Sequence, residues 1–255
     1  MLKFSIVTCT WNSEPLVAEA ITSIRDQDYP NVEHIFVDGG STDGTLERIK
    51  ALDGDVKVLE NVKGGISRAM NAGAAVATGD IIAHMHSDDM YLGTDVFTKV
   101  AAAFEEAPDA PWLFGRCKSL IDGKVLDNRY ETKRYSQAVL MRRNIIPHMS
   151  TFVRRWAFEK AGGFDPRYRC AMDYDLWLKL AKMGDPVQLD DYLAAFRTHA
   201  GSLSSVHVGS CHHEDFRVRW KHSRRHPLEL AEHLGRYAVR TVRLMMAPRT
   251  GMRCC

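Results

Sequence analysis

Short apolar runs alternate with helix-like segments along the first 110 residues, and this alternation limits the fold more than any other feature of the sequence. Such a pattern is typical of a parallel sheet with helices on both faces. We expect strands at 4–8, 34–37, 57–60 and 81–85, and helices at 14–27, up to Lys50, at 66–77 and at 94–106. The sequence therefore predicts an α/β protein whose mostly parallel central sheet is flanked by helices.

Polar residues follow three of the expected strands, at 8–12, 38–43 and 87–89. The carboxyl ends of parallel strands share one edge of a sheet, and ligands bind at that edge. We therefore expect a Rossmann-like first half in which the three polar clusters converge. Gly39-Gly40 is too short for the G-x-G-x-x-G pattern, and no phosphate-loop Lys-Ser/Thr follows it. Hydride transfer and phosphate-loop nucleotide hydrolysis are thereby disfavoured.

Two adjacent carboxylates, Asp88 and Asp89, follow the strand at 81–85. Their repulsion is costly unless a cation offsets it, and a hard divalent ion with phosphate oxygens as further ligands would do so. Such an ion also neutralises the charge that develops on a leaving diphosphate. The alternative is a solvated acidic pair that opens a helix, where the helix dipole favours negative charge.

Two further acids invite a functional and a structural interpretation. Asp38 could accept a hydrogen bond from a base N–H or a ribose hydroxyl, or Asp38 and Asp43 could only cap the glycine-rich turn. Asp173 opens an amphipathic helix, either as a cap or as a general base that deprotonates an acceptor hydroxyl.

Histidines are weaker signals, because a lone histidine is more often structural than functional. His199 lies after an expected strand and could bind metal or diphosphate. His148 and Arg197 are lesser candidates of the same kind. The pair His212-His213 is expected at the surface of a basic helix.

The second half of the chain changes pattern. The expected elements are strands at 112–117, 124–126, 149–154 and 194–198, a short helix to Ala161 and a helix at 173–183. A last helix is expected at 227–246. It carries an apolar stripe of Leu230, Leu234, Ala238, Val242 and Met245 beside Arg236, Arg240 and Arg243.

The C-terminal region is strongly basic. Phe216–Cys255 holds ten Lys/Arg against two Asp/Glu, a charge of +8, whereas residues 1–215 carry −6. This asymmetry suggests an anionic partner, such as a membrane surface or phosphates. The apolar stripe beside the arginines fits a helix that lies on an anionic membrane, and equally a helix packed on the rest of the protein. No recognisable module supports nucleic-acid binding.

Cysteine usage and the N-terminus bear on the compartment. The six cysteines are scattered without paired metal spacing, so we expect free thiols in a reducing cytoplasm. Met1-Leu2-Lys3 leads directly into a strand, which does not indicate export, and no apolar run approaches the roughly 20 residues that span a bilayer. We expect a cytoplasmic protein whose basic tail could contact the inner face of the cell membrane.

Eight short segments carry a resemblance to a known family. They are 5–12 (SIVTCTWN), 37–45 (VDGGSTDGT), 65–73 (GISRAMNAG), 77–82 (ATGDII), 87–89 (SDD), 162–165 (GGFD), 173–178 (DYDLWL) and 197–202 (RTHAGS). In this order they resemble glycosyltransferase family 2, an inverting family with the GT-A fold. The resemblance implies a catalytic domain at 1–205, with a nucleotide-sugar-binding half at 1–110 and an acceptor-binding half at 111–205. A basic amphipathic helical tail at 206–255 lies beyond it.

The resemblance also implies an activity: transfer of a sugar from a nucleotide-diphospho-sugar to an acceptor hydroxyl by one in-line displacement, with Mn²⁺ or Mg²⁺. The nucleotide would be UDP, and the acceptor a glycan or a lipid-linked sugar in polysaccharide or glycolipid synthesis. Asp173 would be the catalytic base. The implied donor-binding residues are Thr8, Trp11, Asp38, Arg68 and Asp88, and the implied metal ligands are Asp89 and His199.

Two positions depart from the family's pattern. Gly39 stands where many members have a second Asp, and Ser87 replaces the first Asp of the D-x-D form, so the identity of the nucleotide stays open.

Two other classes of protein fit the sequence less well. Nucleotidyl transferases usually carry a Gly-rich, Lys/Arg-bearing loop after the first strand, and 9–14 offers none. A non-catalytic relative would be expected to lack Asp89 or Asp173, and both are present.

Overall fold

The computed structural model describes residues 1–126, 133–198, 208–224 and 227–246. Within these ranges one nine-stranded sheet has the order β3-β2-β1-β4-β8-β6-β9-β5, with β7 paired to β6. The strands are β1 (Phe4–Thr10), β2 (Val32–Asp38), β3 (Val56–Leu59), β4 (Ile81–His84), β5 (Met90–Tyr91), β6 (Trp112–Ile121), β7 (Lys124–Leu126), β8 (Thr151–Arg154) and β9 (Val187–Arg197). The first four strands pair in parallel, and β8 joins them to β6 by antiparallel pairing on both sides.

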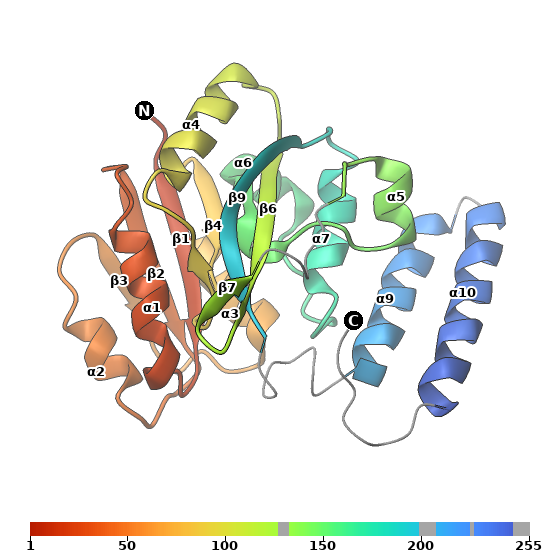
Figure 1. Ribbon diagram of the computed structural model, residues 1–255, viewed down its shortest axis with the longest axis horizontal. Coiled ribbons are helices and arrows are strands. Elements are labelled where there is room, and N and C mark those ends of the chain that lie inside the picture. The colour runs from red at the N-terminus through yellow and green to blue at the C-terminus, as the bar shows by residue number, and fades with distance from the viewer. Residues whose placement is uncertain (127–132, 199–207, 225–226, 247–255) are drawn as a thin grey trace.

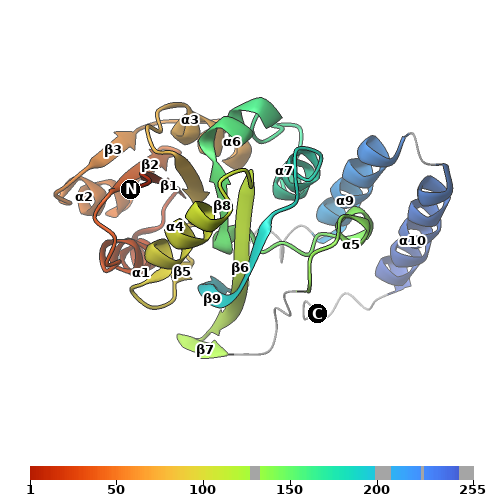
Figure 2. The same cartoon turned by 90° about the horizontal axis from the view of Figure 1, so that it is seen from above.

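The helices lie on both faces of this sheet and beyond its β9 side (Figures 1 and 2). They are α1 (Glu14–Arg25), α2 (Thr45–Lys50), α3 (Ile66–Ala75), α4 (Val96–Glu106), α5 (Gln137–Arg142), the 3-10 turn η1 (His148–Ser150), α6 (Arg155–Ala161), α7 (Met172–Leu180), α9 (Val208–Ser223) and α10 (Pro227–Met246). The expected fold class is therefore confirmed.

Side chains that alternate along the strands build a separate core on each face. On β4, for example, Ile82 packs with the helices α3, α6 and α7, whereas Ile81 and Ala83 pack with α1 and α4. Trp112 and Trp177 stack at 5.7 Å between ring centroids and join β6 to α7. These two cores hold the strand ends in fixed positions.

The largest difference from the sequence-based expectation is β9, which begins at Val187 and not near residue 194. Its first half is partly exposed and includes Asp190 and Asp191, so it lacks the apolar signal of a buried strand. Parallel pairing with β6 makes this segment a strand despite its polarity.

Two helices, α9 and α10, form an antiparallel pair beside α5 and α7 (Figure 1). One face of α10 packs on α9 through buried His233 and through Tyr237, whose ring stacks on Phe216 at 4.3 Å. The expected apolar stripe does not pack on the rest of the protein, because most of its side chains are exposed. Its exposed members are Leu234, Ala238, Val242 and Met245.

Two expectations about this region are wrong. Cys170 and Cys211 form a disulfide between the loop before α7 and the start of α9, where free thiols were expected. His212 is only 4% exposed, because its ring stacks on Tyr237 of α10, whereas His213 is exposed as expected. Neither contact has a local sequence signal, since each joins elements far apart in the chain.

No helix in the described ranges is long and apolar enough to cross a membrane.

Candidate active site

The carboxyl ends of β1, β2 and β4 lie side by side, because β1 pairs in parallel with both neighbours. Thr10 lies opposite Asp38 in this register, so the polar segments that follow the strands leave the sheet at one edge. Trp11 follows β1 and is 70% exposed, an unusual position for so large an apolar side chain. It lies against Gly39 and offers a free ring face for stacking.

Thr8 is fully buried in the sheet, although it was expected to contact the donor. Its Oγ1 lies 2.9 Å from Nε2 of His34 on β2. In this structure the hydroxyl ties β1 to β2. A donor contact by Thr8 stays a prediction.

Asp38 is also fully buried, and both of its oxygens are used within the following turn. Oδ1 accepts the backbone N–H groups of Gly40 and Ser41 at 2.8 Å each, and Oδ2 accepts from Thr10 Oγ1 at 2.9 Å and from Ser41 Oγ. Burial alone would raise the pKa of Asp38, but these hydrogen bonds outweigh it and lower the pKa. The structure thus favours the turn-capping interpretation, and a contact from Asp38 to the base stays a prediction.

Asp89 is 1% exposed and has one satisfied and one unsatisfied oxygen. Its Oδ1 accepts the backbone N–H of Arg197 at 2.8 Å, whereas its buried Oδ2 has no hydrogen-bond partner among the described residues. The Arg197 side chain donates from Nε to the Asp88 carbonyl at 2.9 Å and pairs with Glu19. Antiparallel pairing of β5 with β9 brings these segments together. Burial, assisted by the nearby Asp88 charge, raises the pKa of Asp89 well above its usual range.

This arrangement fits a divalent cation. A buried carboxylate oxygen without a partner is costly, and a cation beside Asp89 would supply that partner. The described ranges contain no group of three or more His, Cys, Asp or Glu side chains placed to hold a metal. Most ligands would therefore come from diphosphate oxygens and water, as is usual for Mg²⁺. His199, the second expected ligand, lies outside the described residues.

A hollow of about 360 Å³ lies between the start of α3 and the loop before α7. Ser67 Oγ donates to the Tyr168 carbonyl at 2.8 Å across this gap, and Asn71 exchanges two hydrogen bonds with the backbone of Phe164. Arg68 is exposed beside the hollow and makes no ion pair within the described part of the chain. The hollow is lined by Gly64, Gly65, Ile66, Ser67, Pro166, Tyr168 and Arg169.

Asp173 lies in the first turn of α7 with its side chain partly exposed. Its Oδ2 accepts from Asn144 Nδ2 at 3.1 Å, and its Oδ1 accepts the N–H of Tyr174 at 2.6 Å. Burial of the carboxyl, with a smaller contribution from the Asp215 charge, raises the pKa of Asp173 to about 7. A carboxylate with a pKa near neutrality is well matched to general-base work.

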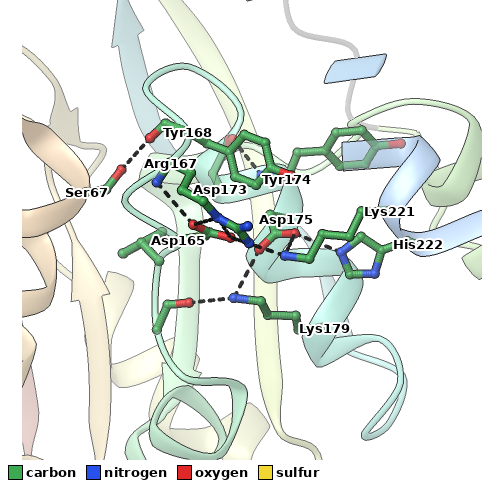
Figure 3. Close-up of polar contacts among 12 residues, drawn as sticks. Ser67, Asp165, Arg167, Tyr168, Asp173, Tyr174, Asp175, Lys179, Lys221 and His222 are labelled. Carbon is green, nitrogen blue, oxygen red and sulfur yellow. Dashed lines mark hydrogen bonds and ion pairs between the residues drawn. The ribbon is translucent and has the colours of Figure 1, made fainter. Parts of the chain in front are cut away.

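Asp175 lies two residues further along α7, and its carboxylate is surrounded by basic side chains (Figure 3). It is fully buried and is held by two ammonium groups, Lys221 Nζ at 2.7 Å and Lys179 Nζ at 3.0 Å, and by the imidazole of His222, whose Nε2 lies at 2.8 Å. Burial opposes ionisation, but the bonds from His222 and Lys221 win and lower the pKa of Asp175 to about 2. We interpret Asp175 as the anchor that fixes α7 against α9.

Several partners of α7 were missed from the sequence. Asn144 holds Asp173, and Glu214 of α9 accepts the backbone N–H groups of Arg169, Cys170 and Ala171 at 2.6–3.1 Å. The disulfide reinforces the same junction. These residues are 29 to 45 positions from their partners, so no spacing in the sequence points to them.

Comparison with known proteins identifies the family of this chain. The family model described as glycosyl transferase family 2 matches residues 5–160, more than half of the chain. The chain belongs to glycosyltransferase family 2.

Relatives of this family 2 glycosyltransferase share roughly a quarter of its residues. An uncharacterized glycosyltransferase of Haemophilus influenzae is 26% identical over 220 residues, which cover 80% of this chain and 68% of that protein. The chondroitin synthase of Pasteurella multocida is 29% identical over 184 residues, which cover 71% of this chain but only 19% of that enzyme.

Solved structures of similar fold include two proteins in complex with nucleotide-sugars. TarS 1–349 of S. aureus in complex with UDP-GlcNAc matches with a TM-score of 0.75 and 20% identity, covering 92% of this chain and 72% of that one. The mannosyltransferase PcManGT from Pyrobaculum calidifontis, in complex with GDP-Man and Mn²⁺, matches with a TM-score of 0.65 and 19% identity, covering 93% and 75%. At this identity the likeness shows the fold, and the expected GT-A architecture is confirmed.

Proposed function

We propose that this family 2 enzyme is an inverting, metal-dependent glycosyltransferase that moves a sugar from a nucleotide-diphospho-sugar to an acceptor hydroxyl. The observation that carries the proposal is that the carboxyl groups of Asp89 and Asp173 lie in different environments. Asp89 is buried with an oxygen that needs a cation, and Asp173 is partly exposed with a pKa of about 7. Paired carboxyl groups with separate environments are characteristic of divided catalytic roles.

The donor would bind at the strand edge. Trp11 would stack on the base, Arg68 would face the diphosphate, and Asp88 would lie near the ribose and the metal. Uridine is our leading nucleotide. TarS was solved with UDP-GlcNAc, which supports it, although PcManGT was solved with GDP-Man.

Mn²⁺ or Mg²⁺ held by Asp89 would neutralise negative charge on the departing nucleoside diphosphate. On the protein side, Arg197 fixes one oxygen of Asp89 and leaves the other available. We retain His199 as a second ligand in the proposal.

Asp173 would act on the acceptor. Its carboxylate would take the proton of the acceptor hydroxyl as that oxygen attacks the anomeric carbon and the bond to the diphosphate breaks. A single displacement of this kind inverts the anomeric configuration. Asn144 would orient the carboxylate by its hydrogen bond to Oδ2.

The acceptor would be a glycan or a lipid-linked sugar in cell-surface polysaccharide or glycolipid synthesis. Similarity to a chondroitin synthase supports a polysaccharide product. We further propose that residues 1–205 form the catalytic unit, and that the region 216–255 brings the enzyme to the inner face of the cell membrane.

Calorimetric titration with UDP, GDP and TDP, with and without Mn²⁺ or Mg²⁺, tests the proposal. We expect one nucleotide to bind only with metal, and Asp89→Asn to weaken that binding about 10- to 100-fold. Asp53→Asn is the matched control, because Asp53 is exposed on the surface. If none of the three nucleotides binds under any metal condition, the proposed donor site is wrong.

A further inference from the structure

A second hollow lies between the loop before α7, α9 and Leu234 of α10, and it shares only Tyr168 with the lining of the hollow described above. Its volume is about 580 Å³. Four cationic side chains and three aromatic rings surround it, together with one leucine of α10. The lining residues are Arg167, Tyr168, Phe216, Arg217, Trp220, Lys221, Arg224 and Leu234.

Two of these cations are already neutralised and two are not. Lys221 pairs with Asp165 and Asp175, and Arg167 pairs with Asp165. Arg217 and Arg224 are exposed and make no ion pair with any residue that the structure describes. Arg217 instead lies over the Tyr168 ring, with its guanidinium carbon 5.5 Å from the ring centroid. The hollow therefore has a net positive charge that an anion would balance.

The rim of the hollow continues into an apolar surface. Leu234 lines the hollow and is 46% exposed, and Val242 and Met245 extend the same side of α10 at 49% and 80% exposed. Trp220 at the rim is 36% exposed, and indole rings favour the boundary between water and lipid headgroups. Arg240 and Arg243 flank the apolar side and make no ion pair within the described ranges. A ligand with an anionic group and an attached apolar chain could contact both the basic hollow and the apolar side of α10.

We propose that this hollow binds the phosphate of an anionic phospholipid headgroup and thereby docks α9 and α10 on a membrane surface. Arg217 and Arg224 would hold the phosphate oxygens, because guanidinium groups match phosphate geometry. The apolar side of α10 would lie among the first acyl carbons, parallel to the bilayer. This site rests on the membrane contact proposed above for residues 216–255. It does not depend on the proposed donor chemistry.

The test is binding of the full chain to vesicles of phosphatidylglycerol and of phosphatidylcholine, measured by sedimentation. We expect binding to the anionic vesicles alone, and about 30-fold weaker binding for Arg217→Gln/Arg224→Gln. Arg25→Gln/Arg48→Gln removes the same charge from α1 and α2 and should change binding less than threefold. Calorimetric nucleotide binding by both double variants should equal that of the unsubstituted protein, which separates this inference from the proposed function.

Four results would overturn the inference. Equal losses in both double variants would show diffuse charge attraction without a site. Unchanged vesicle binding in Arg217→Gln/Arg224→Gln would exclude the hollow directly. Displacement of the protein from vesicles by micromolar glycerol 1-phosphate, or tighter binding to a single-stranded RNA oligonucleotide than to vesicles, would identify a soluble anion or RNA as the ligand.

Discussion

The turn around Asp38 and the first turn of α7 position candidate carboxylates in different ways. Asp38 is held mainly by its own neighbours, since Gly40 and Ser41 lie two and three residues away. Asp173 and Asp175 are held by groups from distant segments: Asn144 for the first, Lys221 and His222 for the second. The Asp38 turn is thus organised mainly by local contacts, whereas the start of α7 depends on long-range packing.

This difference teaches where function and stability are coupled. Loss of a contact within the Asp38 turn should affect one loop, because β1 and β3 still hold β2 in the sheet. Loss of a contact between α7 and α9 affects the helix that carries the proposed base. Substitutions at the start of α7 should therefore change both activity and global stability. Four predictions test this contrast with the Asp38 turn, in order of expected size.

Asp173→Asn should reduce kcat about 10³-fold, because it removes the proposed base while preserving shape. Donor affinity in calorimetry should not change, since Asp173 is proposed to contact the acceptor and not the donor. The control is Asp190→Asn, an exposed acid of β9. An Asp173→Asn enzyme with more than a tenth of the original kcat would remove Asp173 from the mechanism.

Asp175→Asn should lower the free energy of unfolding by about 3 kcal/mol, because it leaves Lys221, Lys179 and His222 facing a neutral group. Urea denaturation measures this loss. The pKa of Asp175 is lowered to about 2, so its contribution is present above the unfolded pKa of about 4 and is lost as pH falls towards 2. A loss of less than about 1 kcal/mol in the free energy of unfolding would contradict the proposed difference between the start of α7 and the Asp38 turn.

The pH profile of kcat should rise tenfold per unit at acid pH and level off above about 7, because Asp173 must lose its proton before it can accept another. Stopped assays at constant ionic strength between pH 5.5 and 8.5 would show this limb. Residual activity of Asp173→Asn should lack it. A flat profile in the unsubstituted enzyme would argue that another group is the base.

Asp38→Asn should cost only about 1 kcal/mol, since the amide keeps the turn's shape while it weakens the charge-assisted hydrogen bonds. Thermal or urea unfolding measures the difference. The same variant in nucleotide calorimetry tests the donor contact, which a tenfold loss of affinity would support. A stability loss as large as that of Asp175→Asn would show that the Asp38 turn is not held mainly by local contacts.

The sequence predicted the parallel strands, the convergence of their polar ends and the family, because each rests on short-range pattern. Apolar runs mark buried strands wherever their partners lie, and parallel pairing then places 8–12, 38–43 and 87–89 at one edge. The start of β9 was not predictable in the same way. Its polar first half becomes a strand only because β6 offers a pairing edge.

Within the candidate site, the sequence by itself determined which acids stand at strand and helix ends. Tertiary structure alone decided their states. Asp38 and Asp173 are the same residue type, yet one has a lowered pKa and the other a raised pKa, because hydrogen bonds outweigh the effect of burial at the first and do not at the second. The disulfide, buried His212 and the basic hollow beside α9 likewise arise from segments that meet only in the folded chain, since each needs partners that no local spacing encodes.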